Sequence, residues 1–276
     1  MGPDSLLERT AAAFGMTAAT KDRSNFYCGV DLGTASIILV ALNEDGEPAA
    51  CEMEPCQVAR DGLIVDYMGA IAITKRLKER LESRLEASIR KAAIAVPPGT
   101  SKTNSGTHRH VVEACDMEVV GVFDEPTAAN AVLRIKDGAV VDIGGGTTGL
   151  SIFKDGKVTY TADEATGGHH MTLVLMGRNK ISYEEAEAFK QGSENSREVF
   201  AVVLPVVEKM ASIVSRHISD RDVDEVWLVG GTACLPKIEN VFADILGKRT
   251  FKPSYPMMVT PLGIAMSSLP EEVFSK

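Results

Sequence analysis

Two short glycine-rich turns carry the residues best suited to chemistry in this sequence. The first is Asp31-Leu-Gly-Thr34 and the second is Asp142-Ile-Gly-Gly-Gly-Thr147. Glycine lets backbone N–H groups approach an anion closely, and the threonine hydroxyls add further donors. Two aspartates beside phosphates would repel them unless a divalent cation lay between. The turns therefore predict a nucleotide phosphate site with Mg²⁺ between the phosphates and the carboxylates of Asp31 and Asp142.

Two further motifs support this interpretation. Glu125 follows a predicted strand and precedes Pro126 at a predicted helix start. A carboxylate at a helix N-terminus is favourable even without function, and capping is the interpretation we prefer for Asp124. Glu125 stands between the two turns in the chain, which favours a functional role. Gly230 and Gly231 follow another predicted strand, where they leave room for a nucleoside to lie against the backbone.

The predicted elements place both turns in the same context. Buried strands are expected at 26–32 and 36–42 around the first turn, and at 138–143 and 148–153 around the second. An Asp-Gly hairpin and a third strand follow each pair. We infer that a strand–turn–strand unit is duplicated within the chain.

Periodicity assigns most of the remaining chain. Further strands are expected at 47–53, 92–97, 117–123, 158–164 and 225–231. Helices are expected at 5–14, 69–90, 104–115, 168–176, 183–191 and 196–219, and from Pro126, Pro236 and Pro261. The helix at 104–115 contains His108, Arg109 and His110, which are interpreted as solvated.

Composition limits the class of protein. The 276 residues suit two lobes with a core each. A formal net charge of -9 argues against nucleic acid or an anionic membrane as the main partner. No run of about 18 apolar residues occurs, which argues against a membrane span, and the start lacks the features of a secretory signal. Five cysteines without a CxxC pair are interpreted as reduced thiols in a cytoplasmic protein.

The order of the motifs resembles that of the actin-like ATPase superfamily. Its phosphate 1, connect 1, phosphate 2, adenosine and connect 2 motifs match Val30–Ile37, Val122–Ala131, Val140–Ile152, Val226–Ile238 and Thr260–Ser267. Longer stretches, including VVDIGGGTTGLSIFKDGKVTYTADEATGGHH at 140–170 and MVTPLGIA, are similar to the ethanolamine-utilization protein J family. That family is chaperone-like and is encoded with a bacterial microcompartment that degrades ethanolamine.

The resemblance implies an α/β, actin-like ATPase fold. This is a duplicated ribonuclease H-like arrangement of two lobes, here with reduced outer subdomains. Residues 1–25 are expected to form an extension that is a short helix or partly disordered. Lobe I is expected at 26–135, with 260–276 packing back on it, and lobe II at 136–259.

The resemblance also implies roles for individual residues. Asp31 and Asp142 would hold hydrated Mg²⁺, and Glu125 would position or activate the attacking water. The implied phosphate donors are Gly33, Thr34, Gly144, Gly145, Gly146, Thr147 and Thr148. The nucleoside would be bordered by Gly230, Gly231 and Thr232, and its ribose reached by Glu187 and Lys190. The implied ligands are ATP or ADP with Mg²⁺.

Departures from the superfamily pattern affect the nucleotide grip. Ala35 stands where the heat-shock chaperones carry a second threonine, so one phosphate donor is missing. Only 87 residues separate Asp142 from Gly230, a short interval that predicts a weak or open adenine site. His169 and His170 are adjacent and point differently, so we expect a place near the phosphates rather than a metal site.

The function implied by the resemblance is that of an ATP-binding, ATP-hydrolysing chaperone-like protein of ethanolamine utilization. It would be a weak Mg-dependent ATPase that assists a microcompartment enzyme or shell partner, and would be cytoplasmic or microcompartment-associated. Three alternatives remain open: a filament-forming actin homologue, a small-molecule kinase, and a nucleotide-binding module without hydrolysis. The trimmed outer subdomains argue against the first, and the lack of a spare acidic constellation argues against the second.

Overall fold

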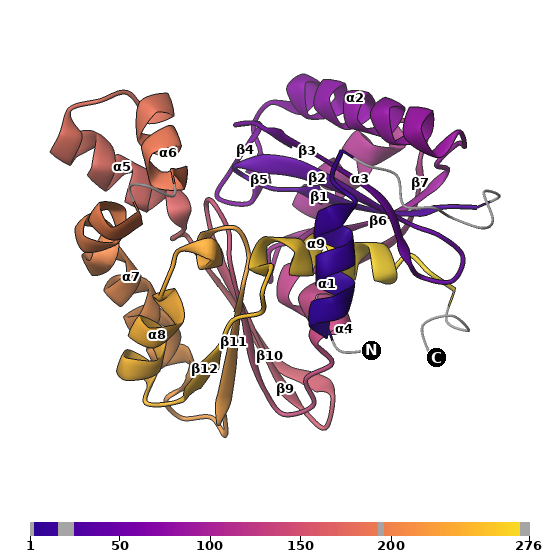
Figure 1. The fold of residues 1–276 in the computed structure, drawn as a ribbon. Helices are drawn as coiled ribbons and strands as arrows, with labels where there is room; N and C mark the ends of the chain where they lie inside the picture. Colours follow the sequence, from indigo (N-terminus) through magenta and orange to yellow (C-terminus); the bar gives the residue numbers. More distant parts are fainter. Residues whose placement is uncertain (1–2, 16–24, 193–195, 271–276) are drawn as a thin grey trace.

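The computed structural model describes residues 3–15, 25–192 and 196–270. Two predicted segments fall partly outside them: residues 16–24 of the N-terminal extension, and 271–276 of the expected C-terminal return. The described chain forms two lobes, each built on a five-stranded sheet (Figure 1).

Lobe I contains a mixed sheet in the order β3-β2-β1-β6-β7. Its strands are β1 (Tyr27–Leu32), β2 (Ser36–Leu42), β3 (Pro48–Pro55), β6 (Lys91–Val96) and β7 (Glu118–Asp124). β1, β2 and β3 are antiparallel neighbours, while β6 and β7 run parallel to β1. The apolar run of β2 is buried on both faces, as its sequence predicts.

Lobe II repeats this topology in the order β10-β9-β8-β11-β12. Its strands are β8 (Gly138–Ile143), β9 (Thr148–Lys154), β10 (Lys157–Glu164), β11 (Glu225–Val229) and β12 (Arg249–Phe251). β8, β9 and β10 are again antiparallel, and β11 and β12 are again parallel to β8. The predicted duplication is therefore confirmed over a whole sheet.

Helices cover the outer face of each sheet and close a separate apolar core there. On lobe I these are α2 (Tyr67–Leu85) and α3 (Lys102–Glu113), and on lobe II α7 (Ser196–Ile218) and α8 (Ile238–Leu246). The outer additions are small, as predicted. They are the hairpin of β4 (Ala59–Arg60) and β5 (Leu63–Ile64), and the pair α5 (Gly168–Asn179) and α6 (Tyr183–Gln191).

Two helices, α4 (Glu125–Leu133) and α9 (Pro256–Met266), lie between the sheets (Figure 1). A third apolar core joins them to both lobes, with Val40 from β2 and Val140 from β8 among its members. A Cβ added at Gly263 of α9 would overlap the Ala128 carbonyl group of α4. The two helices therefore cross at backbone distance, which only glycine allows here.

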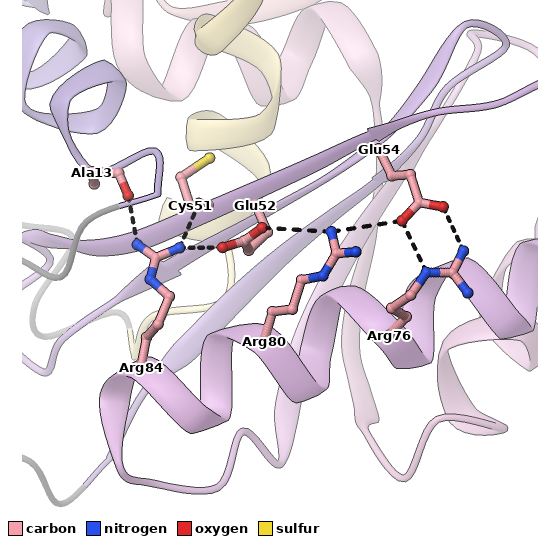
Figure 2. A network of polar contacts seen from close by, with 7 residues as sticks. All are labelled: Ala13, Cys51, Glu52, Glu54, Arg76, Arg80 and Arg84. Atoms are coloured by element: carbon pink, nitrogen blue, oxygen red, sulfur yellow. Dashed lines mark hydrogen bonds and ion pairs between the residues drawn. The ribbon is translucent and has the colours of Figure 1, made fainter.

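Three arginines of α2 form ion pairs with two glutamates of β3, the edge strand of lobe I (Figure 2). Arg76 donates from Nε to Glu54 Oε2 at 3.0 Å, and its Nη2 makes a closer contact with Glu54 Oε1. Arg80, one turn later, lies 3.7 Å from Glu54 and 4.0 Å from Glu52. Arg84 pairs with Glu52. The spacing of four residues along α2 places these guanidinium groups on the face that meets β3.

Arg84 also anchors the N-terminal helix α1 (Pro3–Ala12). It donates to the Ala13 carbonyl oxygen at 2.8 Å and to the Cys51 carbonyl oxygen at 3.1 Å (Figure 2). On α1 itself, Leu7 is fully buried, so this helix packs on the domain as the sequence suggests.

Several local predictions need correction. The last helix begins at Pro256, and Pro261, the predicted start, lies inside it. An internal proline removes one helical hydrogen bond. Ten of the eleven residues of this helix are buried, and their burial offsets that loss. His108 is buried rather than solvated, because its side of α3 faces the core, and its Nδ1 lies 3.0 Å from the Asn104 carbonyl oxygen.

The strands β4, β5 and β12 were not predicted. Within the described part of the chain, no helix is long and apolar enough to cross a membrane.

Candidate functional site

The two glycine-rich turns meet between the lobes. Each follows the first strand of its sheet, β1 or β8, so the duplicated topology brings them face to face. A Cβ added at Gly145 would lie 2.9 Å from the Ala35 Cβ, and one at Gly146 would lie 2.8 Å from the Thr34 Oγ1. Since real Cβ atoms do not approach so closely, the turns fit together only with glycine at these positions.

The predicted carboxylates converge at these turns. Asp31 and Asp142 are the last residues but one of β1 and β8, and Glu125 begins α4. Burial raises the pKa of Asp31 to about 7, with a further contribution from Asp142. Burial also raises the pKa of Asp142 to about 6, and the pKa of Glu125 well above its usual range, where Asp142 and Asp31 add to the effect. Negative charge is therefore concentrated where water is partly excluded.

Asp142 is held in place from two sides. The Thr260 hydroxyl of α9 donates to Asp142 Oδ2, which works against the rise in its pKa. Gly230, at φ +91°, lies against the same carboxylate, and a Cβ there would overlap Asp142 Oδ1. The predicted role of Gly230 was to leave room for a nucleoside, and the structure shows that it also leaves room for Asp142. The contact with Thr260 was not predicted.

The threonines of the second turn differ in their availability. The Thr148 hydroxyl donates to the Thr166 carbonyl oxygen at 2.7 Å, so its proton is committed to the fold rather than to a phosphate. The Thr232 hydroxyl donates to the Gly144 carbonyl oxygen, also at 2.7 Å, and so ties the adenosine motif to the turn. Thr34 stays as a predicted hydroxyl donor, whereas the Thr147 hydroxyl bonds Asp163 and lowers the pKa of that carboxyl group.

The predicted ribose residues lie beside the second turn, paired with each other. Lys190 Nζ donates to Glu187 Oε1 at 2.6 Å, to Thr172 Oγ1 at 2.7 Å and to the Gly168 carbonyl oxygen at 3.2 Å. Burial alone would raise the pKa of Glu187, but the Lys190 ammonium outweighs it and the pKa is lowered. A Cβ at Gly168 would meet Thr232 Oγ1 at 2.5 Å. The structure therefore brings the motifs predicted for phosphate and nucleoside into contact.

The two adjacent histidines lie at the start of α5, next to the second turn. The His169 backbone N–H donates to the Gly145 carbonyl oxygen at 2.8 Å, and its ring Nδ1 lies 3.1 Å from the Tyr183 hydroxyl. His170 Nδ1 accepts from the Gly167 N–H at 3.4 Å. Their rings are 75° apart and have separate partners, so the two side chains point differently, as predicted.

Asp163 on β10 is a carboxylate of this region that sequence reasoning missed. Burial raises its pKa to about 6, while the nearby Thr147 hydroxyl lowers it and Glu164 and Asp142 raise it further. Its Oδ1 is buried and has no hydrogen-bond partner in the part of the chain that the structure describes. The only sequence signal was an acidic residue late in a predicted strand, which by itself does not indicate a site.

These residues suit a hydrated Mg²⁺ ion and a phosphate chain. Carboxylate oxygens are the ligands that Mg²⁺ prefers, and it usually keeps several waters. Among the described residues, no three His, Cys, Asp or Glu side chains are grouped closely enough to bind a metal directly. Binding through water fits that spacing. The buried, unpartnered oxygen of Asp163 fits it as well.

Comparisons with known proteins agree with this geometry. Residues 128–259 match the family described as type IV pilus assembly protein PilM, and residues 51–184 match the MreB/Mbl protein family. Ethanolamine utilization protein EutJ of Escherichia coli is 41% identical over 260 residues, which is 94% of this chain and 92% of that protein.

Solved structures share the fold. The crystal structure of EutJ from Carboxydothermus hydrogenoformans has 43% identity and a TM-score of 0.90, and the match covers 95% of this chain and 97% of that one. MreB5 of Spiroplasma citri, solved with ADP bound, has 18% identity and a TM-score of 0.70, with 88% of this chain and 95% of that one covered. The fold is the actin-like ATPase fold, as predicted.

Proposed function

This chain belongs to the ethanolamine utilization protein EutJ family, and from that premise we propose that it binds ATP with Mg²⁺ between its lobes and hydrolyses it slowly. The observation that carries the proposal is the meeting of the two glycine turns, each beside an aspartate at the end of an equivalent strand. A solved protein of the same fold, MreB5, has ADP bound.

In this proposal the two lobes hold one phosphate chain from opposite sides. The backbone N–H groups of Gly33–Thr34 and Gly145–Thr147 donate to phosphate oxygens, whereas the predicted donor Gly144 gives its N–H to the Thr147 carbonyl oxygen at 2.9 Å. Asp31 and Asp142 orient the water around the cation, which when bound neutralises phosphate charge. Glu125 lies beside both carboxylates and orients the attacking water. A raised pKa suits a group that takes a proton from water.

The partner in the proposal is a protein of ethanolamine utilization. The relatives that cover almost the whole chain carry that description in their names. We propose a chaperone-like role, in which the nucleotide state sets the relation of the two lobes and thereby the affinity for an enzyme or shell component.

Nucleotide binding is tested by thermal melting of the purified chain with and without ATP and Mg²⁺. At a hundredfold excess over the dissociation constant, binding stabilises the folded state by about 2.7 kcal/mol, which corresponds to roughly 5 °C for a chain of this size. Gly146→Val should abolish the shift, because its side chain would fill the space beside Thr34. Gly177→Ala, in open space on α5, is the matched control and should keep it. A wild-type chain whose melting is unchanged by ATP and Mg²⁺ would refute the proposal.

A further inference from the structure

Strand register places a second carboxylate of lobe II in line with Asp142. Asp142 on β8 lies opposite Gly149 on β9, and Gly149 lies opposite Asp163 on β10. Residues directly opposite each other in a sheet project from the same face. Asp163 therefore points to the face that carries Asp142, on the side of the sheet that meets lobe I.

The duplicated row in lobe I has no such residue. There Asp31 lies opposite Ile38, and Ile38 lies opposite Met53. The two positions beside the aspartate are thus apolar in lobe I, where they are Ile38 and Met53. In lobe II the equivalent positions are Gly149 and Asp163. Because the fold forms in lobe I without a carboxylate at this position, the acid in lobe II is not required by the sheet.

The space around this row brings Asp163 close to Glu125. Gly149 contributes no side chain, and a Cβ there would lie 3.2 Å from ring atoms of both Pro126 and Pro98. The start of α4 therefore lies over Gly149. The negative charge of Asp163 also contributes to the raised pKa of Glu125, after burial and the charges of Asp142 and Asp31.

Asp163 also has unused hydrogen-bonding capacity. Its Oδ1 is buried and accepts no hydrogen bond from the described residues. A buried carboxylate oxygen without a partner is unfavourable, and native structures normally satisfy such atoms with water or an ion. The next residue, Glu164, projects from the opposite face and contacts His217 Nε2 at 2.8 Å.

We propose that Asp163 is a positioning residue of the nucleotide site, which orders the water around the nucleotide-bound cation from lobe II. It would act with Asp142 on the same face of the sheet, and its unsatisfied oxygen would accept from a water of the cation. This inference rests on the proposed function and adds a fourth carboxylate to the predicted three.

The test is calorimetric titration of ADP in Mg²⁺ and, separately, in EDTA. For Asp163→Asn we expect the affinity in Mg²⁺ to fall about tenfold, as for other groups that orient the surroundings of a metal. The affinity in EDTA should be unchanged or higher, because a negative charge near the phosphates has been removed. Glu164→Gln removes a neighbouring charge from the other face and should match wild type in both conditions.

Three outcomes would overturn the inference. If Asp163→Asn binds ADP as tightly as wild type in Mg²⁺, Asp163 does not act on the cation, and the proposed function still stands. If its affinity falls equally in both conditions, its role is structural. If the wild-type chain binds no ADP in either condition, the proposed function fails and this assignment fails with it.

Discussion

The two lobes share a sheet topology but meet the central helix α9 differently. In lobe I, β1 approaches α9 through Gly29, where a Cβ would overlap the Ala265 backbone nitrogen and lie 2.7 Å from the Pro261 carbonyl oxygen. The equivalent residue of lobe II, two before its aspartate, is Val140. There the Thr260 hydroxyl of α9 bonds Asp142, and the Gly230 N–H donates to the Pro256 carbonyl oxygen of α9 at 3.0 Å.

Because of this difference, we expect the two lobes to respond differently when a nucleotide binds. Lobe I packs on α9 at backbone distance, so the two are expected to move together. Lobe II is joined to α9 by hydrogen bonds, which rearrange more easily than backbones in van der Waals contact. Lobe II also carries the additional carboxylate, Asp163. We infer that lobe I is the fixed half of the site and lobe II the half that responds to the nucleotide.

The largest expected effect is on ATP turnover. Asp142→Ala and Asp31→Ala should each reduce phosphate release roughly 10²–10³-fold, the scale for removing one group that stabilises developing charge. Asp222→Ala, whose carboxylate is exposed in a surface pair with Lys154, is the control and should leave turnover unchanged. Equal turnover in Asp142→Ala and wild type would mean that the measured hydrolysis comes from elsewhere. A chain that binds ATP without turnover would be a binding module only.

The close approach of lobe I to α9 is tested by stability. Gly29→Ala should lower the free energy of unfolding by about 1–3 kcal/mol, because the added methyl overlaps backbone rather than a flexible side chain. Gly177→Ala, on a helix with nothing within 4 Å, should instead raise it by about 0.5–1 kcal/mol. Urea unfolding measures both. A neutral Gly29→Ala would remove the basis for coupling α9 to lobe I.

The smallest effect concerns pH. Asp31 has a folded pKa of about 7 and Asp142 of about 6, both above the ordinary value of 3.8. A raised carboxyl pKa means that the folded state binds the proton more tightly, so its stability contribution is present in acid and is lost as pH rises through the folded pKa. Without ligand, the chain should therefore become less stable as the pH rises from 4 to 8.

Carboxamide variants separate the two lobes in this experiment. Asp31→Asn should remove the part of the loss that extends to about pH 7, and Asp142→Asn the part that ends near pH 6. At each pH, the free energy of unfolding of the variant is subtracted from that of wild type. Both are measured by urea unfolding in the absence of nucleotide and metal. If both variants keep the pH dependence of wild type, the carboxylates are not the buried groups described above.

Sequence patterns predicted the strands around the turns because each is an apolar run closed by glycine or an Asp-Gly pair. They missed β4, β5 and β12, which have two or three residues each, too few to show a period. They also missed Thr260, which bonds Asp142, and Asp163, which lies on the same face of the sheet as Asp142. Thr260 is 118 residues away in the chain, and Asp163 joins the site only through the register across β9. Such pairings depend on how the elements assemble.

Binding of ATP and Mg²⁺ between the two glycine-rich turns is tested most directly by a crystal structure with Mg²⁺ and a slowly hydrolysed ATP analogue. If ATP binds between the lobes as proposed, phosphate oxygens should contact backbone N–H groups of both turns. Waters of the cation should lie on Asp31, Asp142 and Asp163. A nucleotide bound to lobe II alone, or outside the two turns, would contradict the proposal.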